Sequence, residues 1–329
     1  MKNFPFILIW AVFSGNLMAQ KLPVDTSNFQ YLRNRIKEQT LYIQGDSTNS
    51  VYYLGRGYYK LQLQDYKGCI EDETTAIRLS PESINAYSNR GMALCFMGNY
   101  EPAIRDLSMA IRLQPHDAMY YLNRAYAEDE YGQQKAAIAD LDKAIQLRPD
   151  YAKAFCNRGM AKKKSGDFPG SILDYTRAIQ LNPEYVEAYY DRGMTEDTLR
   201  DYKASLADYN KALELAPGFS PAYANRGIVR RELKDPDGAL ADLNKAIEID
   251  ANLPNYYMNR ALLYADRKKY AEAIEDYNQA IRLDPGNPAL YKGRSNLYTV
   301  TGDTEKAKND ARKATELTNA TSRAGHPGK

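Results

Sequence analysis

The sequence contains little of the chemistry on which most metalloproteins and many enzymes depend. Only three cysteines, Cys69, Cys95 and Cys156, and two histidines, His116 and His326, occur among its 329 residues. The cysteines are odd in number and include no Cys-x-x-Cys pair, so no disulfide framework is evident. We expect them to be buried free thiols that pack as small hydrophobic side chains.

No catalytic motif makes up for this shortage. The sequence has no glycine-rich phosphate loop and no His-Glu-x-x-His motif, and no cysteine shares the register of His116. Its many carboxylates recur periodically along the chain, which is better explained by a scaffold than by an active site. We therefore predict that the protein is not an enzyme and that it requires no cofactor and no metal.

The sequence also lacks an excess of either charge and long apolar runs. It has 44 Lys and Arg residues and 42 Asp and Glu residues, so the charges nearly cancel. Nucleic-acid binding needs an excess of basic residues on one face. The mean hydropathy is −0.62, and only one stretch is continuously apolar, which excludes a protein that crosses a membrane several times. We expect neither a nucleic-acid partner nor a transmembrane span once the N-terminal segment is cleaved.

Residues 1–19 have the layout of a secretory signal peptide. Lys2 supplies the positive charge, Phe6–Phe13 forms the apolar core, and the small residue Ala19 precedes the expected cleavage site. The apolar run is shorter than the ~20 residues that span a membrane, although an uncleaved anchor stays open as the alternative. No cysteine lies before Cys69, so no lipoprotein anchor is expected near the signal. The sequence therefore predicts an exported protein, periplasmic or secreted.

What the sequence does have is an internal repeat with a period of about 34 residues. Prolines recur at Pro81, Pro115, Pro149, Pro183, Pro217 and Pro285, and each gap between them equals one or two periods. If this proline is position 32 of a repeat, eight repeats cover residues 50–321. Repeats one to eight are then 50–83, 84–117, 118–151, 152–185, 186–219, 220–253, 254–287 and 288–321.

Other positions of the repeat are equally constant. Position 4 is aromatic in all eight repeats, positions 8 and 20 are small, and position 27 is always alanine. Apolar residues at positions 20, 21, 24, 27 and 28 have the spacing of one helical face. Glycine followed by Asn or Asp, as in Gly98-Asn99 and Gly166-Asp167, is typical of a turn between two helices. Each repeat therefore predicts a pair of antiparallel helices.

These columns resemble the tetratricopeptide repeat (TPR), which has an aromatic residue at position 4, glycine at 8, tyrosine at 17, alanine at 20 and 27, and proline at 32. The resemblance covers all eight repeats. It implies an all-α fold, a right-handed α-solenoid (superhelix) of eight TPR helix pairs. It also implies a concave groove that is lined by the first helices and binds peptides or other proteins.

The two ends of the repeat array look different from its interior. Residues 20–49 read as a linker followed by a degenerate capping helix, Phe29–Gln44, because Ile36 and Ile43 precede Ile70 and Ile77 by one period. In repeat eight, Lys308 and Thr315 replace apolar residues at positions 21 and 28, as suits a terminal repeat with a polar outer face. Residues 322–329 are expected to be a disordered tail.

Position 7 departs from the TPR pattern, which has leucine there, because it is arginine in every repeat. Position 23 is aspartate in every repeat. The arginines are Arg56, Arg90, Arg124, Arg158, Arg192, Arg226, Arg260 and Arg294, and the aspartates are Asp72, Asp106, Asp140, Asp174, Asp208, Asp242, Asp276 and Asp310. We interpret them as a structural ladder in which the aspartate of one repeat receives the arginine of the next, as Asp72 would receive Arg90. Arg56 would then need Glu38; the alternative is a ligand-binding stripe of arginines.

The resemblance also implies that positions 2, 5, 6, 9, 12 and 13 point into the groove. The candidate peptide-binding residues at positions 6 and 9 are Asn89, Met92, Asn123, Tyr126, Asn157, Met160, Asp191, Met194, Asn225 and Asn259. An amide can donate to and accept from an extended peptide backbone, and a methionine-rich stripe suits an adaptable partner surface. Solvated asparagines and plain packing are the alternatives. Charges at positions 12 and 13 alternate between neighbouring repeats. Mutual neutralisation is the default interpretation, and a partner with a patterned charge is the alternative.

The sequence thus favours a non-enzymatic scaffold or adaptor of the cell envelope that binds a protein or peptide in its groove. The clamp for chaperone C-terminal carboxylates found in some TPR domains is rejected, because only Lys292 and Asn296 match it and no repeat follows to complete it. A glycan- or cell-wall-binding envelope protein, suggested by the 28 tyrosines, remains as an alternative. A self-assembling structural solenoid is another.

Overall fold

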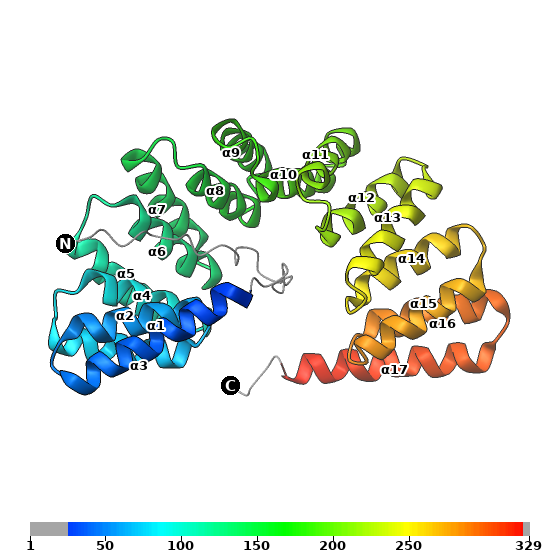
Figure 1. Cartoon of the computed structure of the whole chain (residues 1–329). Coiled ribbons are helices and arrows are strands. Elements are labelled where there is room, and N and C mark those ends of the chain that lie inside the picture. Colours follow the sequence, from blue (N-terminus) through cyan, green and yellow to red (C-terminus); the bar gives the residue numbers. More distant parts are fainter. Residues whose placement is uncertain (1–25, 325–329) are drawn as a thin grey trace. The chain divides into compact units, whose positions relative to one another are not determined.

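The computed structural model describes residues 26–324, so the expected signal peptide (residues 1–19) lies outside the described part of the chain. Within that part the protein forms seventeen α helices and no β strand (Figure 1). The prediction of an all-α solenoid built from helix pairs is confirmed. Each of the eight repeats contains one pair.

The first helices of the repeats are α2 (Ser50–Gln62), α4 (Ile84–Phe96), α6 (Ala118–Glu130), α8 (Ala152–Lys164), α10 (Val186–Thr198), α12 (Ser220–Glu232), α14 (Pro254–Asp266) and α16 (Pro288–Thr301). The second helices are α3 (Tyr66–Leu79), α5 (Tyr100–Leu113), α7 (Gln134–Leu147), α9 (Phe168–Leu181), α11 (Tyr202–Leu215), α13 (Pro236–Ile249), α15 (Tyr270–Leu283) and α17 (Thr304–Ala324). An additional helix, α1 (Thr26–Gly45), precedes the first pair.

The helices belong to two compact units, an N-terminal unit (Met1–Leu181) and a C-terminal unit (Asn182–Lys329). Inside each unit every helix packs against the next one along the chain. First helices of successive repeats also contact one another, α2 with α4, α4 with α6 and α6 with α8 in the N-terminal unit, and α10 with α12 and α12 with α14 in the C-terminal unit. The first helices α2 to α8 of the N-terminal unit therefore form a continuous layer, and so do α10, α12 and α14 of the C-terminal unit (Figure 1).

The small residues of the repeat explain this close packing. Ala103 and Ala110, at positions 20 and 27 of repeat two, are completely buried. A Cβ atom on Gly91, at position 8, would lie only 2.8 Å from Cγ of Leu107 on the facing helix. A Cβ atom on Gly159 would meet the ring of Tyr175 at the same distance of 2.8 Å. A larger side chain at position 8 would therefore push the two helices of a repeat apart.

The turn between the two helices has one left-handed residue, at position 15, in every repeat. Four of these residues are glycines: Gly98, Gly132, Gly166 and Gly302. The other four carry side chains: Gln64, Arg200, Lys234 and Lys268. Left-handed backbone costs a residue with a side chain roughly 1–2 kcal/mol, so the turn geometry is imposed by the packing of the helix pair.

The predicted capping helix is present as α1, which packs against α2. It is longer than the predicted range Phe29–Gln44. At the other end, Lys308 and Thr315 are exposed, as expected of a terminal repeat. The helix α17 continues through residues 322–324, which were expected to be disordered. Repeat eight has Asn319 where six of the other seven repeats have the proline that stops the second helix, and residues 325–329 lie outside the described part.

The three cysteines are buried thiols outside any disulfide, as predicted. Cys69 and Cys95 belong to separate apolar clusters on the first repeats of the N-terminal unit. Burial raises the pKa of the Cys95 thiol to about 12 and also raises that of Cys69. Both thiols therefore stay protonated at neutral pH and act as packing groups.

Candidate functional site

The predicted groove residues lie on the first-helix layer, but they do not share one environment. Met92 is almost completely buried and packs with Leu61 and Cys69, so it belongs to the core. Tyr126, Met160, Met194 and Asn259 are half-buried. The packing alternative for position 9 therefore holds for Met92.

Three of the position-6 asparagines donate hydrogen bonds to other side chains of the protein. Asn123 Nδ2 donates to Ser88 Oγ at 3.5 Å. Asn225 Nδ2 donates to the hydroxyl of Tyr190 at 3.0 Å. In both cases the acceptor belongs to position 5 of the preceding repeat, so these amides link neighbouring first helices.

Asn89, the third of them, is held by a buried carboxyl group. Its Nδ2 donates to Glu73 Oε1 at 2.8 Å. Glu73 is fully buried at position 24, and burial raises the pKa of its carboxyl well above the ordinary value. The absence of a side chain on Gly57 makes room for it, because a Cβ there would lie 2.6 Å from Glu73 Oε1. Asn89 therefore has a structural partner.

Asn157 differs from these three. It is 6% exposed, and its Nδ2 has no hydrogen-bond partner. Asp129, at position 12 of the preceding repeat, is 8% exposed, and its Oδ1 has no partner either. Both residues line a pocket with room for about one water-sized group, together with Ala125, Tyr126, Leu141 and Met160. Here the chain places an unused donor and an unused acceptor on the surface shared by α6 and α8.

A lysine holds the other oxygen of Asp129. Lys164 Nζ, at position 13 of repeat four, lies 2.7 Å from Asp129 Oδ2 and 3.2 Å from Glu130 Oε1. Burial raises the pKa of Asp129, and the Lys164 ammonium opposes that shift. In the C-terminal unit Arg231 Nε makes the equivalent contact to Asp266 Oδ2, at 2.5 Å. Charges at positions 12 and 13 therefore neutralise one another between neighbouring repeats in these two places.

The arginine and aspartate columns do pair, but the predicted direction was wrong. Each arginine binds the aspartate of its own repeat, so Arg90 pairs with Asp106 and not with Asp72. All eight pairs are bidentate, with Nε to Oδ2 and Nη2 to Oδ1 distances between 2.6 and 2.9 Å. The ladder therefore ties the two helices of one repeat together.

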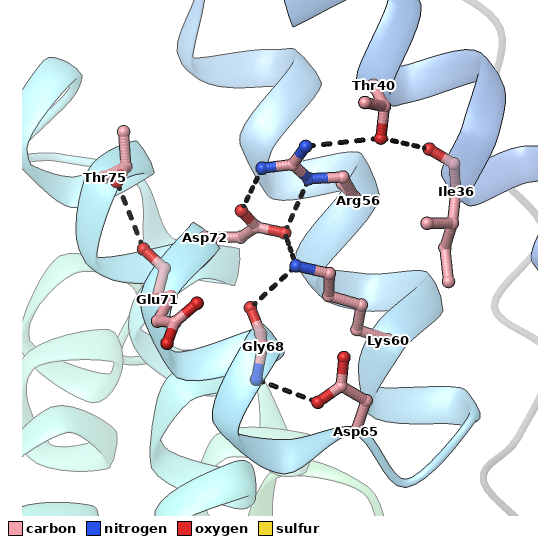
Figure 2. A network of polar contacts seen from close by, with 9 residues as sticks. All are labelled: Ile36, Thr40, Arg56, Lys60, Asp65, Gly68, Glu71, Asp72 and Thr75. Carbon is pink, nitrogen blue, oxygen red and sulfur yellow. Dashed lines mark hydrogen bonds and ion pairs between the residues drawn. The ribbon is translucent and has the colours of Figure 1, made fainter.

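Six of these arginines reach the second helix of the preceding repeat with their third nitrogen, and Arg56 reaches α1. Figure 2 shows Arg56 between Asp72 of its own repeat and Thr40 of α1, whose Oγ1 accepts from Nη1 at 3.3 Å. Glu38, which was expected to receive Arg56, is instead bonded by Arg35 and by the hydroxyl of Tyr42. The other acceptors, which occupy position 25, are Thr74, Ser108, Asp142, Asn210, Asn244 and Asn278.

Position 25 was not identified from the sequence as a partner of the arginines. The sequence does contain a pattern that indicates it, because position 25 carries a hydroxyl, amide or carboxylate wherever an arginine follows in the next repeat. In repeat eight this position is Arg312. The arginine also lies 5.3–5.9 Å from the position-4 ring in seven repeats. The arginines therefore have a structural role, because they contact the aspartate of their own repeat and most of them also contact the position-4 ring and position 25 of the preceding repeat.

Most of the tyrosines are also used for packing. Tyr175 and Tyr209 at position 24 are completely buried. The rings of Tyr66, Phe96 and Tyr126 follow one another across three repeats, with centroids 5.2 and 6.2 Å apart. These rings pack on one another, which weakens the argument that the tyrosine content points to sugar binding.

Within residues 26–324, no three side chains of His, Cys, Asp or Glu gather as a metal site would require. His116 is exposed in the turn between α5 and α6. None of the helices in that range is long and apolar enough to cross a membrane.

Comparison with known proteins yields several family matches. Models described as tetratricopeptide repeat match residues 84–117, 152–185, 186–219, 220–253 and 254–287, and a model described as TPR repeat matches 130–166. Together they cover more than half of the chain. No curated protein sequence matches it.

Solved structures with a similar fold are numerous. The chain resembles a chain of the APC/C hetero-tetramer Cut9–Hcn1, with a TM-score of 0.63 and 17% identity over 81% of this chain and 53% of that one. It therefore spans about half the length of that relative. A tetratricopeptide repeat protein from Parabacteroides merdae ATCC 43184 gives a TM-score of 0.60 and 17% identity, covering 75% of this chain and 98% of that one. A structure described as human IFIT1 dimer with PPP-AAAA gives 0.56 and 13% identity, over 82% and 73%. At these identities the likeness shows the fold alone.

Proposed function

Because the chain belongs to the tetratricopeptide repeat family, we propose that it is a non-enzymatic scaffold or adaptor that binds a protein or peptide on its first-helix layer. In the N-terminal unit the binding site includes Asn157 and Asp129, with Tyr126 and Met160 beside them. The partner is held chiefly through its backbone, because the polar groups that this surface leaves unused are an amide and a carboxylate.

The unpartnered pair Asn157 and Asp129 carries this proposal. A buried polar atom without a partner costs about 1–3 kcal/mol, and most such atoms in proteins are bonded. The pocket beside these two atoms has room for about one water-sized group. An extended segment passing over α6 and α8 would therefore bond to both atoms through a bridging water, which can accept from Asn157 Nδ2 and donate to Asp129 Oδ1.

The absence of catalytic activity and the cellular location are part of the same proposal. The repeated arginines and aspartates bind each other, and this structural use supports a scaffold over an active site. Export to the periplasm or the exterior rests on the sequence of residues 1–19. N-terminal sequencing of the protein from the envelope fraction tests export, and a mature chain that begins at Met1 would contradict it.

A crosslinking pull-down from the envelope fraction tests the binding proposal. Asn157→Ala removes the unused donor without breaking a bond inside the protein, so the captured partner is expected to be lost while the fold is unchanged. Glu214→Gln, on the exposed face of α11, serves as the matched control and should keep the partner. Retention of the partner by Asn157→Ala and by Asp129→Asn would contradict binding at this site.

The two alternative functions give different results in simple assays. A glycan-binding protein would be retained on insoluble peptidoglycan, and a self-assembling solenoid would show a concentration-dependent mass by light scattering. Under the proposal the purified chain shows neither behaviour.

A further inference from the structure

Position 11 of the first helix faces the aspartate of the arginine–aspartate pair, and its charge varies from repeat to repeat. In repeats one, four and six it is a base. Lys60, Lys162 and Arg230 each place a nitrogen 2.8 Å from Asp72, Asp174 and Asp242 respectively. Figure 2 shows this arrangement around Asp72, whose two oxygens are shared between Arg56 and Lys60. In these repeats two cations hold one carboxylate.

In repeat three the same position is an acid, Glu128. Its side chain is largely buried, and Oε1 lies 3.8 Å from Nε of Arg124, the guanidinium that binds Asp140 at 2.6 Å. The second oxygen of Glu128, Oε2, is buried without a hydrogen-bond partner. One guanidinium therefore stands beside two carboxyl groups.

Repeat five, in the C-terminal unit, has a related arrangement, in which the Glu196 side chain also hydrogen-bonds the carboxylate of the facing Asp208. Glu196 occupies position 11, and its Oε2 is buried without a partner. Arg192 binds the facing Asp208 with Nε to Oδ2 at 2.7 Å. The charged groups that act on Glu196 are Asp208 and Asp201 on the α11 side and Arg192 on its own helix. For Glu128 they are Asp140 on α7 and Arg124 on α6.

The electrostatic consequence is the same in both repeats. Burial and then the charge of Asp140 raise the pKa of Glu128 to about 7, against the smaller opposing effect of Arg124. Burial and the charge of Asp208 raise the pKa of Glu196 to about 7 as well. Each arginine already makes a bidentate bond to its aspartate, so it cannot fully neutralise a second carboxylate.

We propose that Glu128 and Glu196 make repeats three and five pH-responsive: each is a buried carboxyl group beside an arginine that already binds the facing aspartate, and the loss of its proton weakens the contact between the two helices. Repeats one, four and six have a base at this position, so they serve as internal controls that should not respond to pH in this way. The response is therefore local to two repeats, one in each unit.

The direction of the effect follows from linkage. A glutamate in the unfolded chain has a pKa of about 4.3, and both folded-state values are higher. The folded repeat therefore holds a proton that the unfolded chain releases, and its stability falls as the pH rises from about 4.3 to about 7 and is then constant. In that interval the equilibrium constant for opening rises by up to about tenfold per pH unit for each group.

Carboxyl titration of the full chain, with ¹³C-labelled glutamate side chains followed by NMR, tests the proton directly. Two signals with midpoints near pH 7 are expected, one removed by Glu128→Gln and the other by Glu196→Gln. Glu73 gives a separate high-midpoint signal that neither substitution removes. If neither substitution removes a signal that titrates above about pH 6, the proposal is wrong.

Amide hydrogen exchange tests the mechanical consequence, with each variant compared with the wild type at the same pH. The ratio of opening constants in α6 and α7, wild type over Glu128→Gln, should grow by up to about tenfold per pH unit between pH 4.5 and 7. Glu128→Lys copies repeat four and should abolish this growth, while α8 and α9, where Lys162 lies, should show none. Equal pH profiles for wild type and both variants, or the same growth in α8 and α9, would overturn the proposal.

Discussion

Asn89 and Asn157 occupy the same position of two repeats in the N-terminal unit, yet the structure uses them differently. Asn89, at the front of the array, donates to the buried carboxyl of Glu73. Asn157, two repeats later, has a buried Nδ2 without a partner, beside the equally unpartnered oxygen of Asp129. At the front of the first-helix layer the asparagine is therefore used in a hydrogen bond within the protein. The surface between α6 and α8 instead has a donor and an acceptor without hydrogen-bond partners.

The difference depends on neighbours that are not part of the repeat pattern. Repeat one has Glu73 where repeats two and three have Leu107 and Leu141. A leucine cannot accept from an amide, so Asn157 has no equivalent of Glu73 on α7. Asn123 also follows a leucine at that position, but it bonds Ser88 at position 5 of the preceding repeat, whereas position 5 of the repeat before Asn157 is Leu122. Asn157 therefore lacks an acceptor at both positions.

The largest expected effect concerns the scaffold that both regions share. Arg90→Ala leaves Asp106 without the guanidinium that binds both of its oxygens. It should lower the free energy of unfolding by about 3 kcal/mol, as for other largely buried ion pairs. Arg158→Ala should cost less, because Lys162 still lies 2.8 Å from Asp174. Denaturant unfolding of both variants measures the difference, and an equal or larger loss for Arg158→Ala would contradict the pairing scheme.

A direct comparison of the two asparagines comes next in size. Asn89→Ala leaves the Glu73 carboxyl without its donor and should destabilise the chain by about 1–3 kcal/mol. Asn157→Ala removes a buried donor that has no partner, so it should destabilise the chain by less than Asn89→Ala does. Thermal and denaturant unfolding give both values. Equal destabilisation by the two substitutions would show that the two regions do not differ as described.

The buried carboxyl should also make the front of the array sensitive to pH. Burial raises the pKa of Glu73, so the folded state retains a proton that the unfolded chain loses. Stability relative to Glu73→Gln should therefore fall as the pH rises above about 4.3, by up to about 1.4 kcal/mol per pH unit. Unfolding of wild type and variant between pH 4 and 9 measures it; parallel curves would refute the assignment.

The smallest effect is expected at position 25, where the two regions should behave alike. Thr74→Ala removes the hydroxyl that accepts from Arg90 at 3.1 Å, and Asp142→Ala removes the exposed partner of Arg158. Each should cost about 0.5–1 kcal/mol, because the arginine keeps its bidentate bond. Local hydrogen exchange at the junction between the two repeats concerned is the appropriate measurement. A loss above about 2 kcal/mol exceeds the usual contribution of one such bond and would contradict this secondary role.

The helix pairs could be predicted because the same pattern recurs in eight repeats. Close helix packing explains both the small residues at positions 8, 20 and 27 and the glycine-containing turns, and the structure shows this packing. The direction of the arginine–aspartate pairing could not be obtained in this way. Asp72 lies near the midpoint of the segment between Arg56 and Arg90. The repeat period alone therefore fits pairing of Asp72 with either arginine. The geometry of the helix pair determines that each arginine binds the aspartate of its own repeat.

The candidate site was predictable only in part. The asparagine column pointed to the first-helix layer, and Asn157, Tyr126 and Met160 do line one pocket there. The roles of the asparagines in repeats two, three and six depend on acceptors such as Glu73 and Tyr190, which come from positions that vary between repeats. Hydrogen-bond partners of this kind depend on side-chain directions across two helices, which a one-dimensional pattern does not contain.

Site-specific photo-crosslinking tests the central claim, that the partner lies on the first-helix layer between α6 and α8. A photoreactive residue is placed at Met160, beside the Asn157 and Asp129 pocket, and in a second variant at Arg105, an exposed residue of the second helix α5. The account predicts a crosslinked partner from Met160 that disappears when Asn157→Ala is added, and none from Arg105. Capture from Arg105 alone, or capture from Met160 that survives Asn157→Ala unchanged, would contradict it.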